Sequence, residues 1–234
     1  MITKPTVSPP RCAPFGAGRL ADWLKQAQAG DTLAMCRLGY AYMKRSKFDK
    51  AEQWLQRSAD GGEILGMYFL ARLFRTQWRL DGAEFWYQRA ADAGNVEAMI
   101  NLGRMFYGMR RFEDAERSFR QGADAGSVES MLGLAKALSV QHRVAESEQW
   151  VRCAADEGDP EAMFAASRAC RSHGNHLEEL RWCRRAAEVG YITAMWELGG
   201  LLMMNNEVEE ACLWYRRAGE ADRLRDAHGV GTRL

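Results

Sequence analysis

The chain has 234 residues, of which 47% are hydrophobic and 27% charged, so it is long and apolar enough to form a sizeable core and is not a disordered chain. Thirty-two Lys and Arg oppose 31 Asp and Glu, and the formal net charge of +1 does not by itself predict binding to nucleic acid or an anionic membrane. No apolar run approaches the roughly 18 residues of a spanning helix, and no signal-peptide core is present. We therefore expect a soluble cytoplasmic protein.

The cysteines do not form a recognisable metal or disulfide pattern. They share no common spacing and include no C-x-x-C pair. In a chain of this length they are typical of reduced thiols, most of which fill the core. The six are Cys12, Cys36, Cys153, Cys170, Cys183 and Cys212.

The chain opens with a Pro/Gly-rich stretch over residues 1–17 that has no periodicity and predicts a disordered arm. Residues from about 19–29, with Trp23 and Leu24, indicate a half repeat that caps the N-terminal end of a repeat array. Glycines then recur 32 residues apart without an insertion or deletion, at Gly30, Gly62, Gly94, Gly126, Gly158 and Gly190. Such a period is the signature of a repeat architecture.

Other residue types keep the same period, and we number positions by their distance from the glycine that opens each repeat. Position +5 is always methionine, at Met35, Met67, Met99, Met131, Met163 and Met195. Position +8 is leucine except for Ala166, and position +9 carries only small residues. Tryptophan fills position +24 in every repeat except the third, where Ser118 stands beside Phe119.

Each repeat is predicted to be two helices. Positions +5, +8, +9 and +12 form one apolar helical stripe, and positions +18, +21, +25, +28 and +29 form a second. Asp31, Asn95, Ser127 and Asp159 at position +1 are suited to cap the first helix, with Pro160 following the last of them. The opening glycine suits the left-handed residue that ends a helix.

A single helix pair cannot bury its own stripe, so the repeats must stack. The predicted fold is an all-α, right-handed α-solenoid of six 32-residue helix-turn-helix repeats, starting near residues 30, 62, 94, 126, 158 and 190. It occupies one domain over residues 18–222, followed by a polar C-terminal tail over residues 223–234. This period excludes a globular enzyme fold.

The repeat resembles a known family. The segment from Met35 to Tyr42, together with Ala51 and Trp54, is similar to tetratricopeptide (TPR)-like helix pairs. The stretch from Trp86 to Gly103 is closer to the Sel1-like repeat (SLR) subfamily, whose pattern joins W-Y-x-x-A-A-x-x-G to A-x-x-x-L-G. The resemblance implies a non-enzymatic adaptor or scaffold without a cofactor, which in bacteria often serves signalling, envelope or virulence systems.

In such a solenoid the first helix of each pair lines the concave face, and positions +6, +10 and +13 lie off its apolar stripe. Position +10 carries a cation in four successive repeats, and none has an acid four residues before or after it. We expect these cations and the neighbouring apolar residues to bind an acidic or extended segment of a partner protein. The predicted peptide-binding groove consists of Tyr68, Arg72, Arg75, Ile100, Arg104, Tyr107, Leu132, Lys136, Phe164, Arg168, Arg171 and Trp196.

Two observations leave alternatives open. Glu97, Glu129 and Glu161 at position +3 could neutralise the cations in the folded chain, and the same cations could instead contact the phosphates of a nucleic acid. Self-association through the open ends of the solenoid also remains possible.

The other alternative is a metal-binding regulatory protein. Cys170, His173, His176 and Cys183 could form a Cys₂His₂ zinc site. Positions +12, +18 and +25 place Cys170, His176 and Cys183 on apolar stripes. We therefore expect core packing to account for three of these four residues, and we expect the protein to bind no metal. No Walker loop, H-E-x-x-H or G-x-S-x-G motif is present, and we expect no catalytic residue.

Overall fold

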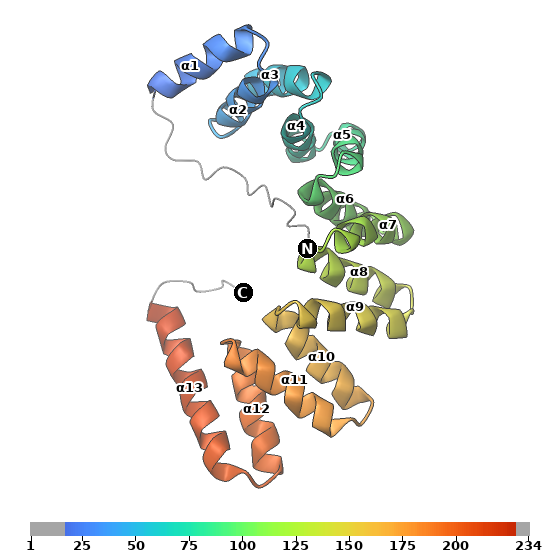
Figure 1. The fold of residues 1–234 in the computed structure, drawn as a ribbon, viewed down its shortest axis with the longest axis vertical. Helices are drawn as coiled ribbons and strands as arrows, with labels where there is room; N and C mark the ends of the chain where they lie inside the picture. The colour runs from blue at the N-terminus through green and yellow to red at the C-terminus, as the bar shows by residue number, and fades with distance from the viewer. Residues whose placement is uncertain (1–16, 228–234) are drawn as a thin grey trace, which may run out of the picture. The chain divides into compact units, whose positions relative to one another are not determined.

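The computed structural model describes residues 17–227, which form α-helices and contain no β-strand (Figure 1). The helices are α1 (Ala17–Gln28), α2 (Thr32–Met43), α3 (Phe48–Asp60), α4 (Ile64–Thr76), α5 (Leu80–Asp92), α6 (Val96–Gly108), α7 (Phe112–Asp124), α8 (Val128–Val140), α9 (Val144–Asp156), α10 (Pro160–Ser172), α11 (His176–Glu188), α12 (Ile192–Met204) and α13 (Val208–Ala227).

The helix boundaries repeat with the period of the sequence. The even-numbered helices α2 to α12 are the first helices of the pairs, and each begins 32 residues after the one before. The odd-numbered helices α3 to α13 are the second helices and begin at the same interval. This confirms an all-α fold of helix-turn-helix units and is consistent with six repeats. Helix α13 continues to Ala227, so residues 223–227 of the predicted tail are helical. The predicted arm, apart from Ala17, lies outside the described residues.

Two compact units make up the chain, one ending at Met99 and the other beginning at Ile100 within α6. In unit 1, helices α1 to α5 pack each against the next in chain order. In unit 2, helices α7 to α13 do the same. The single domain over residues 18–222 stays a prediction.

Side chains at position +1 cap the first helices as expected. The Asp31 carboxylate accepts hydrogen bonds from the backbone N–H groups of Leu33 (2.9 Å) and Ala34 (3.1 Å). Asn95, Ser127 and Asp159 each accept one from the residue three positions later, at 2.7, 3.2 and 2.7 Å. The glycines that open the repeats all have positive φ, between 84° and 99°, which confirms their role in ending a helix.

The core follows the first apolar stripe closely. All six methionines at position +5 are at most 8% exposed, and the residues at position +8 are at most 1% exposed. The second stripe is shorter than predicted, because position +18 lies at the first residue of each second helix and reaches the surface. Phe48, Val144, His176 and Val208 are all exposed there, so the expectation that this position belongs to the core is wrong for them.

Small residues at position +9 allow the two helices of a pair to approach closely. A Cβ atom placed on Gly39 would lie 2.4 Å from Leu55 Cγ, and one on Gly199 would lie 2.5 Å from Tyr215 Cε1. Real Cβ atoms essentially never come so near another heavy atom. The large residue at position +25 therefore fills the space that the missing side chain leaves.

A second left-handed residue recurs where the two helices of each repeat join, at position +16. Ser46, Trp78, Arg110, His142 and Asn206 have φ between 55° and 64°, and Gly174 has φ of 70°. Side chains other than glycine, asparagine or aspartate are uncommon in this conformation. The six residues share no side-chain property that could have marked the position in the sequence.

Trp78→Gly should stabilise the protein. The Trp78 side chain is 83% exposed, so its removal loses little packing, while glycine adopts a φ of 60° without strain. We expect the free energy of unfolding to rise by about 0.5 to 1 kcal/mol in urea titrations followed by circular dichroism. The control Ser139→Gly, within α8, should lower it by up to about 1 kcal/mol. A loss of stability in Trp78→Gly would contradict this expectation.

Candidate functional site

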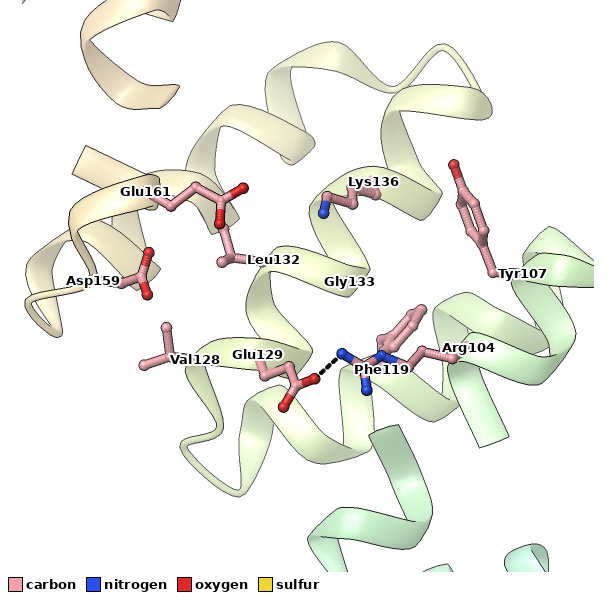
Figure 2. Close-up of a pocket in the computed structure, with 10 residues that line it drawn as sticks. All are labelled: Arg104, Tyr107, Phe119, Val128, Glu129, Leu132, Gly133, Lys136, Asp159 and Glu161. Atoms are coloured by element: carbon pink, nitrogen blue, oxygen red, sulfur yellow. Dashed lines mark ion pairs between the residues drawn. The ribbon is translucent and has the colours of Figure 1, made fainter. Parts of the chain in front are cut away.

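Unit 2 contains an open pocket of about 580 Å³ on its first helices (Figure 2). Helix α8 forms its middle, with Asp159 and Glu161 of the α10 start on one side and Arg104 and Tyr107 of α6 on the other. The remaining lining residues are Phe119, Val128, Glu129, Leu132, Gly133 and Lys136. The fold thus brings together four residues of the predicted groove: Arg104, Tyr107, Leu132 and Lys136.

The pocket carries charges of both signs. The Arg104 guanidinium forms an ion pair with Glu129 of the following repeat, drawn as the dashed line in Figure 2. The expectation that the position +10 cations are uncompensated is therefore wrong for Arg104, and position +3 supplies the acid, as the alternative held. Sequence spacing within one helix could not show this, because the two residues lie on neighbouring first helices.

The other cations at position +10 differ in the groups that they contact. In unit 1, Arg72 lies over the rings of Tyr68 and Phe69, with its Cζ atom 5.6 and 5.7 Å from their centroids. Burial raises the pKa of the Tyr68 hydroxyl, and the nearby Arg72 opposes that shift. In unit 2, Lys136 and Arg168 are exposed, and no carboxylate among residues 17–227 pairs with either.

The remaining groove residues are spread over the two units. Ile100 is only 3% exposed and belongs to the core, so its prediction as a groove residue is wrong: position +6 faces inward there. Phe164 is half-buried, with its ring centroid 5.6 Å from that of Tyr191. Arg75 is exposed.

A second pocket in unit 2, of about 360 Å³, contains the last two predicted residues, Arg171 and Trp196. Its other lining residues are His176, Glu179, Glu197, Gly200, Leu201 and Met204. Arg171 forms ion pairs with both Glu179 and Glu197, and these hydrogen bonds raise the pKa of its guanidinium. His176 Nδ1 lies 3.1 Å from the second carboxylate oxygen of Glu179.

Sequence reasoning missed Glu179, whose carboxylate is 1% exposed. The signal was present, because Glu179 stands at position +21, which is alanine or serine in every other repeat. A long acidic side chain at a position that otherwise carries only small residues cannot be explained by helix packing alone. The other occupants of position +21 are Ala51, Ala83, Ala115, Ser147 and Ala211.

Glu179→Ala should leave stability nearly unchanged, although it removes a buried ion pair. Alanine is the residue that this position accommodates elsewhere in the chain, and Arg171, being 44% exposed, keeps Glu197 and solvent as partners. We expect the free energy of unfolding to change by less than about 1 kcal/mol in urea titrations. A loss of several kcal/mol would mean instead that Glu179 is a structural requirement.

The four residues of the possible zinc site separate in the structure. Cys170 and Cys183 are buried, as the apolar positions predict, and burial raises the pKa of Cys183 to about 12. His173 and His176 are exposed, so the packing explanation is wrong for His176. Among residues 17–227 no group of three or more His, Cys, Asp or Glu side chains is placed to hold a metal ion.

Several cations on the second helices, or directly before them, form ion pairs with acids. Arg79 pairs with Glu52 and Arg143 with Glu116, both at 2.7 Å and both joining one repeat to the preceding one. Burial alone would raise the pKa of Glu116, but hydrogen bonds from Arg120, Arg143 and Gln141 lower it overall. These ion pairs within the chain neutralise part of the positive charge of the second helices.

Comparison with known proteins agrees with this fold. Residues 100–160 match the tetratricopeptide repeat family, and no curated protein matches the chain. None of the described helices is both long and apolar enough to cross a membrane.

Three solved structures are similar in fold. A protective antigen of uropathogenic Escherichia coli with an SLR fold is 22% identical, with a TM-score of 0.67, over 86% of this chain and 48% of that one, so the chain spans about half its length. A Sel1 repeat protein from Oxalobacter formigenes is 19% identical, with a TM-score of 0.63, over 87% and 93%. YrrB, a TPR protein with an unusual peptide-binding site, is 12% identical, with a TM-score of 0.53, over 72% and 92%.

The family match and the similar structures confirm the resemblance that the repeat sequence suggested. Residues 100–160 are similar to the tetratricopeptide repeat family, and the chain has the α-solenoid fold of the SLR and TPR proteins.

Proposed function

We propose that the chain is a non-enzymatic scaffold whose unit 2 binds an extended segment of a partner protein in the α6, α8 and α10 pocket. The observation that carries the proposal is the lining of that pocket, in which the apolar Val128 and Leu132 occur together with the exposed ammonium group of Lys136, and no carboxylate among residues 17–227 pairs with that group. An apolar floor with a few charged groups on first helices suits a peptide segment.

The charges of the pocket specify the segment further. Because Arg104 already pairs with Glu129, the partner's acidic group is expected at Lys136 rather than along a row of free cations. Asp159 and Glu161 on the far side favour a segment that is not acidic throughout. The same carboxylates disfavour a nucleic acid, whose phosphates need several cations and no acids on one face.

The test is capture of partner proteins from the native host by wild type and two variants. Lys136→Glu, combined with Arg168→Glu at the same position of the next repeat, should reduce recovery of the specific partner at least about tenfold, because charge reversal at Lys136 opposes an acidic group in the pocket. Both side chains are exposed, so stability should change by less than about 0.5 kcal/mol.

The matched control is Arg152→Glu with Arg216→Glu, two exposed cations on the second helices α9 and α13. Its recovery should equal that of wild type in quantitative mass spectrometry. Equal recovery by both double variants would remove the proposal. Binding of a long polyanion that weakens steeply with salt would favour nucleic-acid binding instead.

A further inference from the structure

Several departures from the repeat pattern meet in the second pocket of unit 2. Glu179 replaces a small residue at position +21, Gly200 replaces the aromatic or cationic residue at position +10, and Glu197 is the only acid at position +7. They come from α11 and α12, and all three line the same pocket. In a repeat array each position is set by the same packing demand, so substitutions that converge in space point to a local role.

Stability gives no reason for these departures. A carboxylate that is 1% exposed must be taken out of water, and the ion pair with Arg171 seldom gains more than an apolar side chain would at the same place. Gly200 lies inside α12, where glycine weakens a helix relative to alanine or arginine. Glu179 and Gly200 therefore lower the stability of their repeats, whereas the residues at the same positions of the other repeats do not.

The pocket offers an aromatic surface beside carboxylates. The Trp196 indole donates its N–H to Asp222 at 3.1 Å, and its ring lies 5.5 Å from that of Tyr215, so its orientation is fixed while 44% of the side chain stays exposed. Gly200 leaves room beside it, since an added Cβ atom would meet only the Tyr215 hydroxyl, at 3.7 Å.

With the His176 imidazole neutral, the lining of the pocket carries a formal charge of −1. Two carboxylates, those of Glu179 and Glu197, oppose the single guanidinium of Arg171, which bonds to both. An anionic ligand would have to displace a carboxylate from Arg171. A cation can instead approach Glu197, whose side chain is 34% exposed, and stack on the Trp196 ring.

We propose that this pocket binds a basic side chain of a partner segment, with an arginine guanidinium stacked between Trp196 and the Gly200 gap and bonded to Glu197. Met204, which is 85% exposed, and Leu201 contact the aliphatic part of that side chain. Glu179 acts as a positioning residue, because it holds Arg171 in place and keeps the pocket negative. The pocket is separate from the one used in the proposed function and does not depend on it.

The test is nuclear magnetic resonance of the Trp196 indole N–H, assigned by its absence in Trp196→Phe. The probes are the Nα-acetyl amides of arginine, lysine, norleucine and glutamate. We expect a saturable shift with the arginine amide, a weaker affinity for the lysine amide because ammonium lacks the planar fork, and no saturable shift with the other two.

Two variants test the role of the Glu197 carboxylate and the role of the gap at Gly200. Glu197→Gln should weaken arginine-amide binding about fivefold or more, because it removes the carboxylate that faces solvent. Gly200→Arg should abolish binding, because it supplies the pocket with a cation of its own. The matched control Ser139→Arg adds the same charge on α8 and should bind like wild type.

Four results would overturn the proposal. These are no shift with the arginine amide, an equal response to the norleucine amide, a saturable response to the glutamate amide, or unchanged binding by Glu197→Gln. Because Glu197 is partly exposed and Gln keeps its shape, that variant tests the proposal even if Gly200→Arg fails to fold.

Discussion

Leu134→Ala in α8 is expected to lower the free energy of unfolding of unit 2 by about 3 kcal/mol. The Leu134 side chain is 0% exposed and belongs to the position +8 leucines that join the helices of each repeat. Its truncation loses apolar contacts and leaves a cavity between helices that can close only partly. Urea titrations monitored by circular dichroism at two protein concentrations would measure the loss.

The same substitution at the surface provides the control. Leu177→Ala in α11 removes a side chain that is 63% exposed and should change stability by less than about 0.5 kcal/mol. Equal effects of the two variants would mean that position +8 does not carry the core. A second transition in Leu134→Ala alone would show that the repeats no longer unfold together.

Gly103→Val in α6 should cost about 3 kcal/mol, at the upper end of the overpacking range. A Cβ atom at this residue would lie 2.7 Å from both Cδ1 and Cε1 of Phe119, and valine adds two more carbons there. Phe119 is 4% exposed and cannot turn away, so α6 and α7 must separate. Chemical denaturation and the near-ultraviolet signal of the aromatic residues would both register the change.

Two controls separate crowding from helix propensity. Gly103→Ala should cost much less, because Ala71 occupies the same position in the second repeat opposite Tyr87 and alanine favours helix by about 1 kcal/mol over glycine. Gly108→Val, at the end of α6, has no neighbouring atom within 4 Å of an added Cβ and should have little effect. A loss in Gly108→Val as large as in Gly103→Val would show that crowding is not the cause.

Much of the fold could be predicted from the sequence because helix packing repeats along the chain. The glycines and methionines defined the period, and the caps at Asp31 and Asp159 placed the helix starts. The left-handed residues at position +16 were not predictable, because residues as different as Trp78 and His142 occupy that turn. There the geometry comes from the flanking helices rather than from side-chain preference.

The candidate site was predicted only in part. Arg104, Tyr107, Leu132 and Lys136 line one pocket, because they share the face of successive first helices, while their role in binding a peptide stays a prediction. The partners of the cations were not evident, since Glu129 lies 25 residues after Arg104 and meets it only when two repeats stack. Ile100 shows the same limit, because its position off the apolar stripe did not predict that it is only 3% exposed.

The sequence by itself determined the repeat, its two helices, its capping residues and the apolar first stripe, because these depend on spacing along one chain segment. Only the tertiary structure decided which charges are neutralised, that Glu179 is buried beside Arg171, and that Trp196, Glu197 and Gly200 share a pocket. The physical reason is that helicity and amphipathicity are local properties, whereas the environment of a charge is set by residues from other repeats.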